Sequence, residues 1–211
     1  PLSKHVGGGP GLGVVVLGEA EYPKSLAAIY QPPLVLYVRG NLPPDVECLG
    51  IVGARRFSRY GEGIAEKLGE ELVASGFCVV SGAARGIDSA AHRGALRTGR
   101  TVAVLGCGVD IAYPAENRRL LADIVASGGA ILSEYAPGTP PLPAFFPARN
   151  RIISGLSKGV IVVEAAERSG SLITAQLALD EGRDVFAVPG SIYSPTSQGC
   201  HRLIPQGATL V

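Results

Sequence analysis

Short apolar runs alternate with segments of helical spacing along most of this chain. Each run is continuous, such as VIVV at 160–163, and continuous runs are typical of parallel strands that are buried on both faces. Residues 60–75 instead place Ile64, Leu68 and Leu72 four residues apart, which is the spacing of one helix face. The predicted strands are 48–52, 77–81, 101–106, 130–133, 160–164 and 185–188. The predicted helices are 60–75, 88–97, 116–126, 150–156 and 172–181, with a short helix near 201–204.

The alternation of strands and helices predicts the fold class. Strand–helix–strand units of this length form parallel pairs, so we expect an α/β protein with a doubly wound, mostly parallel sheet. We assign residues 45–211 to this domain. Residues 1–44 contain the glycine-rich stretch GGGPGLG and are interpreted as an N-terminal extension or linker, with one candidate strand at 34–38.

The charge balance limits the ways in which this chain can bind a polyanion. Charged residues make up 18% of the sequence, and the formal net charge is +1. A protein that coats nucleic acid non-specifically is strongly basic, so any positive surface here must be local.

The cysteines and the hydropathy pattern point to a reducing compartment. The four cysteines form no CxxC pair, and three of them lie in or beside apolar strand-like runs, so we expect small buried side chains and no zinc site. The apolar part of the N-terminal segment is too short to cross a membrane, and no signal-peptide pattern accompanies it. We therefore expect a cytoplasmic protein without membrane insertion.

Glycine, serine and arginine recur where the predicted strands end. The carboxyl ends of parallel strands meet at one edge of the sheet, which is where ligands bind in doubly wound folds. Arginine suits phosphate because its planar guanidinium makes two parallel, charge-assisted hydrogen bonds. The sequence thus predicts a positive rim at this edge. Its arginines are Arg55, Arg56, Arg59, Arg85, Arg149, Arg151 and Arg168.

The stretch RSGSLITA, Arg168 to Ala175, follows the strand at 160–164 and opens a predicted helix. A helix N-terminus presents unpaired N–H groups, so Gly170 and its two serine neighbours could hold a phosphate. The alternative is a serine that caps an ordinary helix. The stretch by itself leaves both interpretations open.

Established nucleotide and catalytic motifs fit poorly. There is no GxxxxGK[ST], and the second predicted strand ends in Ser81 rather than in an acidic residue, so a P-loop enzyme and an NAD enzyme are both disfavoured. Asp88 is interpreted as a helix N-cap and His92 as a packed or capping residue. Glu164 could be a general base, although pairing with a nearby arginine is favoured. No metal-ligand spacing occurs, so we expect no cofactor. Because the catalytic motifs also fit poorly, we expect a protein that is not an enzyme.

Several long motifs, in this order, resemble one family. They are IVGARRFSRYG, SGAARGIDSAAHRGAL, GCGVDIAYPAEN, SEYAPG, FPARNRIISGLS and EAAERSGSLITAQLALDEGRDVFAVPGS. The chain from about Tyr22 to Val211 is similar to the DNA-processing protein A family, also called Smf. The resemblance implies an extended Rossmann-like domain that binds single-stranded DNA and forms a homodimer. It implies a recombination mediator that protects incoming DNA and helps to load the RecA recombinase during natural transformation.

Many members of this family also carry an N-terminal sterile-alpha-motif-like domain and a C-terminal winged-helix-like domain. The resemblance implies that these domains are missing or nearly so here, with residues 1–44 as a candidate remnant of the first.

The resemblance also implies a set of phosphate-pocket residues. Ala54 replaces the usual serine of the family's Gly-Ser-Arg motif, and Ala115 and Pro143 stand where relatives often carry lysine, so two cations of the pocket are absent. The strand-end analysis adds Arg56 and Arg151 to the set. The positions that match the family's motifs are Gly53, Arg55, Ser58, Gly61, Gly82, Arg85, Gly86, Arg149, Asn150, Ser169, Gly170 and Ser171. Alanine at Arg55, alone or together with Arg149, is expected to abolish single-strand binding without unfolding the domain.

Aromatic residues gather in the same predicted loops and are candidates for base stacking. They are Phe57, Tyr60, Tyr113, Phe145 and Phe146. For Phe145 and Phe146, packing of the long loop is an equal alternative.

The sequence leaves two alternative functions. A nucleotide phosphoribohydrolase of the lysine-decarboxylase-like fold is disfavoured, because its PGGxGTxxE signature is replaced here by RSGSLITA, with no acidic residue after Thr174. The second alternative is a module that binds only a partner protein, through an apolar face near 165–179 or through the tail. The sequence does not show which of these surfaces would be used.

Overall fold

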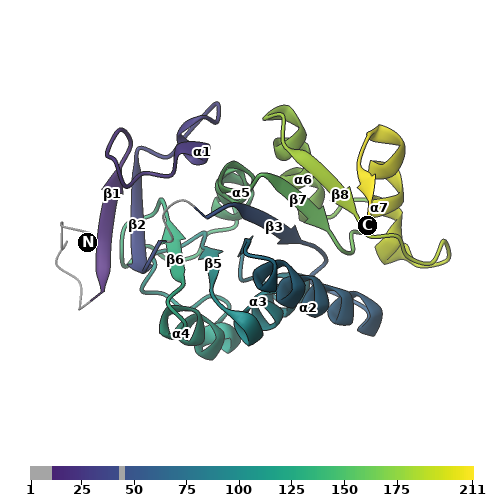
Figure 1. Ribbon diagram of the computed structural model, residues 1–211, viewed down its shortest axis with the longest axis horizontal. Helices are drawn as coiled ribbons and strands as arrows, with labels where there is room; N and C mark the ends of the chain where they lie inside the picture. The colour runs from purple at the N-terminus through teal and green to yellow at the C-terminus, as the bar shows by residue number, and fades with distance from the viewer. Residues whose placement is uncertain (1–10, 43–45) are drawn as a thin grey trace.

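The computed structural model describes residues 11–42 and 46–211, and its strands form one nine-stranded sheet in the order β1-β2-β6-β5-β4-β3-β7-β8-β9 (Figure 1). The strands are β1 Leu12–Val16, β2 Val35–Gly40, β3 Cys48–Val52, β4 Cys78–Ser81, β5 Thr101–Val104, β6 Ala130–Ser133, β7 Gly159–Val162, β8 Asp184–Ala187 and β9 Thr209–Leu210.

The strand order places a switch point in the middle of the sheet. From β3 to β9 every pairing is parallel, whereas β1 and β2 are antiparallel to each other and β2 is antiparallel to β6. The chain runs outward from β3 through β4 and β5 to β6, then returns to the other side of β3 and continues through β7 and β8. The predicted doubly wound, mostly parallel, Rossmann-like fold is confirmed. Such a fold leaves a crevice beyond the carboxyl ends of β3 and β7.

Helices cover both faces of the sheet, with α2, α3 and α4 on one face and α1, α5 and α6 on the other (Figure 1). Their bounds are α1 Lys24–Ala27, α2 Arg59–Ala74, α3 Ile87–Thr98, α4 Arg118–Ala126, α5 Phe145–Leu156, α6 Gly170–Asp180 and α7 Gln198–Leu203, with short 3₁₀ turns at Ala115–Asn117, Pro195–Ser197 and Ile204–Gln206. None of the helices in the described part of the chain is long and apolar enough to cross a membrane.

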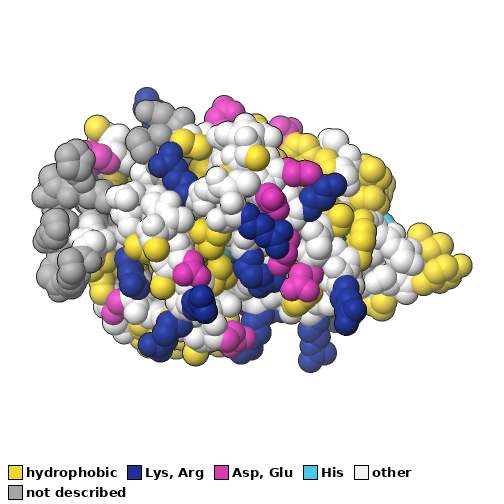
Figure 2. Space-filling model, turned by 60° about the horizontal axis from the view of Figure 1, so that its bottom comes forward, with side chains coloured by type: hydrophobic (Ala, Val, Ile, Leu, Met, Phe, Trp, Pro, Cys, Tyr) yellow, Lys and Arg dark blue, Asp and Glu magenta, His cyan; other side chains and the backbone are white. Residues whose placement is uncertain are grey.

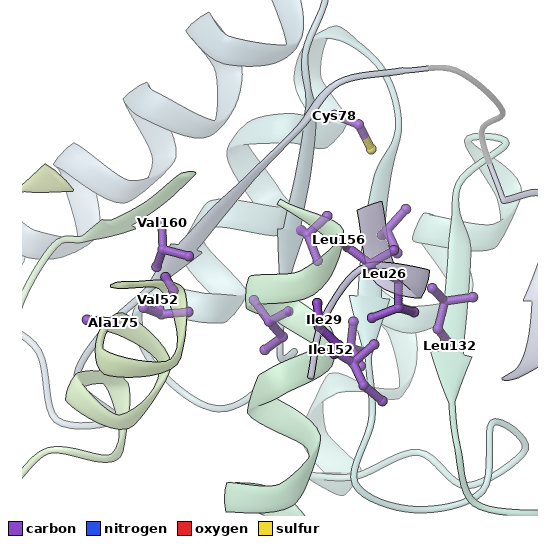
Figure 3. Close-up of a cluster of buried hydrophobic side chains, with 14 of the residues drawn as sticks. Leu26, Ile29, Val52, Cys78, Leu132, Ile152, Leu156, Val160 and Ala175 are labelled. Atoms are coloured by element: carbon purple, nitrogen blue, oxygen red, sulfur yellow. The ribbon is translucent and has the colours of Figure 1, made fainter. Parts of the chain in front are cut away.

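Successive strand residues supply the core on opposite faces, as the two-residue period of a strand requires. Ile51 and Val79 face the layer of α2 and α3, whereas their neighbours Val52 and Val80 belong to the cluster on the other face. Figure 3 shows part of this second cluster, in which Ile152 of α5 lies among side chains from the sheet and from the N-terminal segment.

The segment that precedes β3 is part of the same structure. The candidate strand at 34–38 is confirmed as β2, while β1 and α1 were missed because the first is short and the second spans only four residues. Leu26 and Ile29 pack against Gly155 of α5, where a Cβ would lie 2.8 Å from each of them. The domain boundary near residue 44 stays a prediction, since residues 43–45 lie outside the described ranges.

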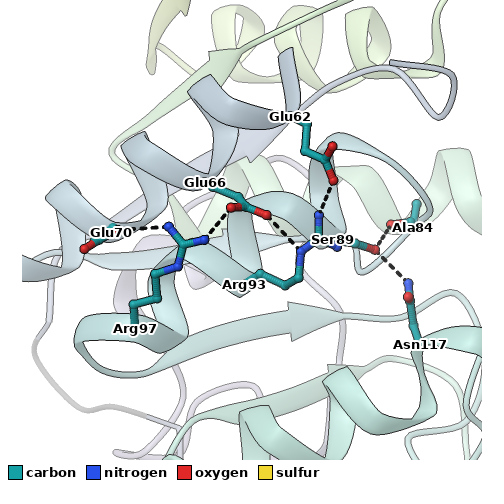
Figure 4. A network of polar contacts seen from close by, with 8 residues as sticks. All are labelled: Glu62, Glu66, Glu70, Ala84, Ser89, Arg93, Arg97 and Asn117. Atoms are coloured by element: carbon teal, nitrogen blue, oxygen red, sulfur yellow. Dashed lines mark hydrogen bonds and ion pairs between the residues drawn. The ribbon is translucent and has the colours of Figure 1, made fainter. Parts of the chain in front are cut away.

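Helices α2 and α3 pack closely and are joined by exposed ion pairs (Figure 4). Arg93 bonds to Glu62 at 2.8 Å and to Glu66 at 3.0 Å, and Arg97 bonds to Glu66 and Glu70. Basic and acidic side chains are intermixed on the molecular face in Figure 2. Each exposed pair of this kind contributes little to stability. The pairs nevertheless occupy the guanidinium groups of these arginines, which are therefore less available to a ligand.

Two sequence predictions concern buried groups of α3. His92 is confirmed as a packed residue: it is fully buried, and its Nδ1 lies 2.8 Å from the hydroxyl of Thr101. The prediction that Asp88 caps the helix is wrong, because Gly86 occupies the N-cap position. Asp88 lies in the first turn and accepts a hydrogen bond from the N–H of Ala84 at 3.3 Å.

Candidate functional site

A cleft of about 680 Å³ lies beyond the carboxyl ends of β3 and β7, at the switch point of the sheet. Its walls are the loop after β3, the first turns of α5, and the loop from β7 into α6. A smaller pocket adjoins it under Tyr113 and Phe146, and the two share Arg55 and Arg149. Of the predicted phosphate-pocket residues, the cleft is lined by Gly53, Arg55, Arg56, Arg149, Asn150, Ser169, Gly170 and Ser171.

Arg55 and Arg56 are the exposed cations of this cleft. The guanidinium carbon of Arg55 lies 5.8 Å from the ring centre of Phe146, which is a cation–π distance. Neither arginine forms an ion pair with a carboxylate among the described residues. Both therefore keep their hydrogen-bond donors available to a ligand.

Arg149 occupies a different position, in the floor of the cleft. It is only 4% exposed and donates hydrogen bonds to the backbone carbonyls of Gly82, at 2.8 Å, and of Val104. Asp88 faces it, and the positive charge of Arg149 lowers the pKa of Asp88, although burial is the larger effect and leaves that pKa raised overall. Burial likewise lowers the pKa of Arg149. Arg149 thus ties the ends of β4 and β5 to α5.

The loop after β4 approaches the loop after β3 closely because it is built on glycine. Gly86 has φ +85°, and a Cβ there would overlap the backbone carbonyl of Ala54. A Cβ on Gly82 would lie 2.7 Å from both the Arg149 guanidinium and the Asp88 carboxylate. Close packing of the backbone around Arg149 therefore explains why Gly82 and Gly86 are glycine. Gly82 also lines the smaller pocket.

The start of α6 forms another wall of the cleft. Ser169 is confirmed as a helix cap, since its hydroxyl accepts the N–H of Ser171 at 3.4 Å and lies 2.8 Å from the Ser171 hydroxyl. A Cβ on Gly170 would meet nothing within 4 Å, so this backbone is open to the cleft. Asn150 of α5 donates to the Gly170 carbonyl at 3.4 Å. The anion interpretation of this turn stays a prediction.

Ser58 and Gly61 lie outside the cleft lining and serve Glu164 instead. The Ser58 hydroxyl and N–H both donate to the Glu164 carboxylate, at 2.6 and 2.9 Å, and Thr196 donates to it at 3.3 Å. A Cβ on Gly61 would collide with that carboxylate. The expected pairing of Glu164 with an arginine is therefore wrong: this buried carboxylate is held by hydroxyl and backbone donors.

Two predicted arginines are already paired. Arg85 is exposed beside the smaller pocket and forms a bidentate ion pair with Glu116. Arg151 bonds to Glu134 at 2.6 Å and to the carbonyl of Gln31 at 2.9 Å, so it points toward the N-terminal segment and not into the cleft. The position of Arg151 near the carboxyl edge of the sheet did not predict this orientation, because the side chains of successive residues in α5 project in different directions.

The candidate stacking residues divide into two groups. Phe145 and Phe146 lie in the first turn of α5 rather than in a loop, and Phe146 packs on Tyr113 with ring centres 5.3 Å apart. Phe145 stacks at 4.0 Å on Tyr135, which belongs to the SEYAPG motif but is not among the predicted stacking residues. Phe57 and Tyr60 are exposed but lie outside the lining of the cleft, and the Tyr60 hydroxyl donates to the carbonyl of Pro189 at 3.0 Å.

Fold and site together define a Rossmann-like α/β protein with an arginine-lined cleft at the switch point of its sheet. Residues 13–211 match the model of the family described as DNA recombination-mediator protein A. The chain belongs to this family.

Curated relatives agree with this assignment. The chain is 51% identical to the DNA processing protein DprA of Streptococcus pneumoniae over 199 residues, covering 90% of this chain and 67% of that protein. It is 50% identical to the protein Smf of Escherichia coli over 192 residues, covering 90% of this chain and 51% of that protein. The chain therefore spans between half and about two thirds of these relatives.

Solved structures place the fold in the same family. The X-ray structure of DprA from Streptococcus pneumoniae superposes with a TM-score of 0.89 at 48% identity, covering 94% of this chain and 70% of that one. DNA processing protein A from Helicobacter pylori, for which a single-stranded DNA binding mode is described, gives 0.83 at 31% identity, covering 93% and 90%. A molybdenum cofactor carrier protein from Chlamydomonas reinhardtii, at 0.54 and 17% identity over 78% and 89% of the chains, shares the fold alone.

Proposed function

We propose that this chain is the single-stranded DNA-binding domain of a recombination mediator and that the cleft holds the DNA backbone. The observation that carries the proposal is the pair of unpaired, exposed arginines, Arg55 and Arg56, at the mouth of the switch-point cleft. The likeness to the Helicobacter pylori protein supports it, since a single-stranded DNA binding mode is described for that relative.

The charges along the cleft favour a polyanion. Three arginines line it against one carboxylate, that of Asp88, which is buried and faces Arg149. A chain with a net charge of +1 therefore concentrates positive charge where Gly170 leaves the backbone open. Phosphate contacts from arginine and from a helix N-terminus carry no sequence information, so binding is sequence-tolerant and weakens with salt.

Aromatic rings in the cleft and in the segment after β3 provide surfaces for bases. Phe146 lines the cleft beside Arg55, and Phe57 and Tyr60 are exposed in the segment that follows Arg56. A single strand exposes base faces that a duplex hides, so stacking on these rings favours single-stranded over double-stranded DNA.

The finer parts of the proposal rest on the family. We infer a mediator that protects incoming single strands and helps to load the RecA recombinase in homologous recombination during natural transformation, acting as a cytoplasmic homodimer without catalytic activity.

An enzyme on a free nucleotide is the alternative, and the carboxylates argue against it. Glu164 is saturated by Ser58 and Thr196, and Asp88 is committed to Arg149 and Ala84. A phosphoribohydrolase needs an available acidic group at the sugar, and the described lining of the cleft offers none.

The test is fluorescence anisotropy of a labelled oligo-dT over a salt series, with duplex of equal length as the competitor. We expect a preference for the single strand. Arg55→Ala and Arg56→Ala should each weaken binding and reduce the slope of log K against log salt by about 0.7, the value for one phosphate contact of a single strand. Arg119→Ala, on the exposed outer surface of α4, is the matched control and should change neither quantity.

Thermal melting of each variant separates lost contacts from lost structure. Equal binding by all variants would overturn the placement of DNA in this cleft. Tight binding of a mononucleotide that competes fully with oligo-dT, together with its cleavage, would favour the enzyme instead.

A further inference from the structure

Two cysteines lie directly opposite each other at the amino end of the sheet. Cys48 is the first residue of β3, Cys78 is the first residue of β4, and the parallel register pairs the two. Paired residues of neighbouring strands project their side chains from the same face of the sheet. Both cysteines accordingly border the core cluster on the α5 face, and both are free thiols.

The spacing of the two residues suits a covalent link. Neighbouring strands lie about 4.8 Å apart, and disulfides join Cα atoms that are about 4.4–6.8 Å apart. The Cys48 thiol donates to the carbonyl of Val46 at 3.5 Å, and the Cys78 thiol lies 3.8 Å from the carbonyl of Val79 and 4.0 Å from that of Arg100. The neighbouring Cys78 side chain lowers the pKa of the Cys48 thiol, whereas the Cys48 side chain and burial raise the pKa of Cys78, so Cys48 is the first of the pair to become a thiolate.

Only one of the two thiols is accessible. Cys48 is partly exposed and lines a groove of about 900 Å³ at the edge of the sheet opposite the arginine-lined cleft, whereas Cys78 is 1% exposed. Cys107 and Cys200 are buried at other places in the core. The arrangement combines an accessible thiol that can attack with a buried partner that can resolve the product.

We propose that Cys48 and Cys78 are an oxidative modification site that forms a reversible intrachain disulfide on reaction with a low-molecular-weight disulfide of the glutathione type. The Cys48 thiolate attacks one sulfur of the reagent, forms a mixed disulfide and releases one thiolate. Cys78 then attacks the Cys48 sulfur, forms the Cys48–Cys78 bond and releases the second thiolate. Two protein thiols are oxidised, one reagent disulfide is reduced to two thiols, and the two protons pass to the released thiolates.

The mixed disulfide also removes part of what raises the pKa of Cys78. The Cys48 side chain is the largest cause of that raised pKa, and burial is another. The charge of a Cys48 thiolate is absent once Cys48 is oxidised, so the second step becomes easier after the first. Thiol–disulfide exchange runs in both directions, so an excess of a reducing thiol reverses the modification.

The experiment treats the folded chain with oxidised glutathione and maps its peptides by mass spectrometry without reduction. The expected product links Cys48 to Cys78, leaves Cys107 and Cys200 free as internal controls, raises the melting temperature and reverts with dithiothreitol. Cys48→Ser should slow thiol loss by roughly tenfold or more. Cys78→Ala should accumulate glutathione on Cys48, which tests the order of the two steps.

Two results would overturn the proposal. One is a stable glutathione adduct on Cys48 in the unsubstituted chain, since the buried partner would then not resolve it. The other is modification of all four cysteines at similar rates, which would report unfolding rather than a built site. Oligo-dT binding is measured on the same samples and should be retained after oxidation, because the pair lies at the opposite sheet edge. The outcome is thus independent of the proposed DNA binding.

Discussion

Replacing Arg149 with alanine should destabilise the domain, although the residue lines the candidate DNA cleft. Arg149 is 4% exposed, donates to the carbonyls of Gly82 and Val104, and faces the buried carboxylate of Asp88. Removing one member of such a buried charged group costs about 3–5 kcal/mol, because the remaining charge is left uncompensated. For a chain of this size the loss corresponds to a fall in melting temperature of roughly 6–20 °C.

The loss should also depend on pH through Asp88. Its folded-state pKa is raised by burial and lowered by Arg149, so the variant raises it further. Because this pKa is higher in the folded state, the unfolded chain loses the Asp88 proton at a lower pH than the folded chain does. Stability therefore falls as pH rises from about 3.8 through the folded-state pKa. The cost of Arg149→Ala is therefore smaller at pH 4 than at pH 7. Adding Asp88→Asn should restore part of the loss at pH 7, since no buried charge remains.

Urea denaturation followed by circular dichroism at both pH values measures these effects. The four proteins of the double-substitution cycle give the coupling between Arg149 and Asp88, which we expect to be about 1–3 kcal/mol. An unchanged denaturation midpoint for Arg149→Ala, or an equal cost at the two pH values, would refute this assignment of Arg149 to the fold. The result also decides which variants test DNA binding without a change in stability. Arg55→Ala is such a variant by this reasoning. The double substitution of Arg55 and Arg149, proposed from the sequence, would change stability as well as binding.

Two further predictions concern groups inside and beside the cleft. Gly170→Ala adds a methyl group that meets nothing within 4 Å in the protein, so the melting temperature should stay the same or rise slightly, as expected for alanine in a helix. If a phosphate approaches this backbone, the same variant should bind oligo-dT at least tenfold more weakly by isothermal titration calorimetry, and unchanged affinity would move the DNA away from α6. Burial lowers the pKa of His92 to about 3, so the folded state resists its protonation and stability is lost as pH falls below about 6.5. The stability lost through His92 amounts to about 2 kcal/mol at pH 5. His92→Phe should therefore reduce the fall in the denaturation midpoint between pH 7 and pH 5. An equally steep fall in this variant would show that other groups control the pH dependence of stability.

The fold was largely predictable from the sequence because parallel strands buried on both faces leave a strong pattern. The runs at 48–52 and 130–133 match β3 and β6 residue for residue. The N-terminal strands were harder to predict, since β1 at the sheet edge is partly exposed and the antiparallel pairing of β2 with β6 depends on residues far apart in the chain. Helix α5 begins five residues before its predicted start at Asn150, because Pro147 in its first turn resembles a loop residue but is compatible with a helix start.

The site was predictable to the level of loops but not of individual side chains. Strand topology brought the loops after β3 and β7 together, as expected, and eight of the predicted phosphate-pocket residues line one cleft. The sequence could not distinguish an available arginine from a committed one. Arg55 is open to solvent, whereas Arg151 is bound by Glu134, which lies 17 residues away in the chain. Such partners depend on tertiary packing, and charge counting along a sequence contains no signal for them.

Helix α5 contacts four other parts of the fold, which fix the floor of the cleft before a ligand binds. Phe145 stacks on Tyr135, Arg149 bonds to the ends of two strands, Arg151 bonds to the N-terminal segment, and Ile152 lies in the core. A helix held by these contacts cannot rotate or slide without breaking several of them at once. The cleft floor is therefore preorganised and loses little conformational entropy when a strand enters. Association should then be limited by diffusional encounter and electrostatic attraction, with no slow rearrangement before binding.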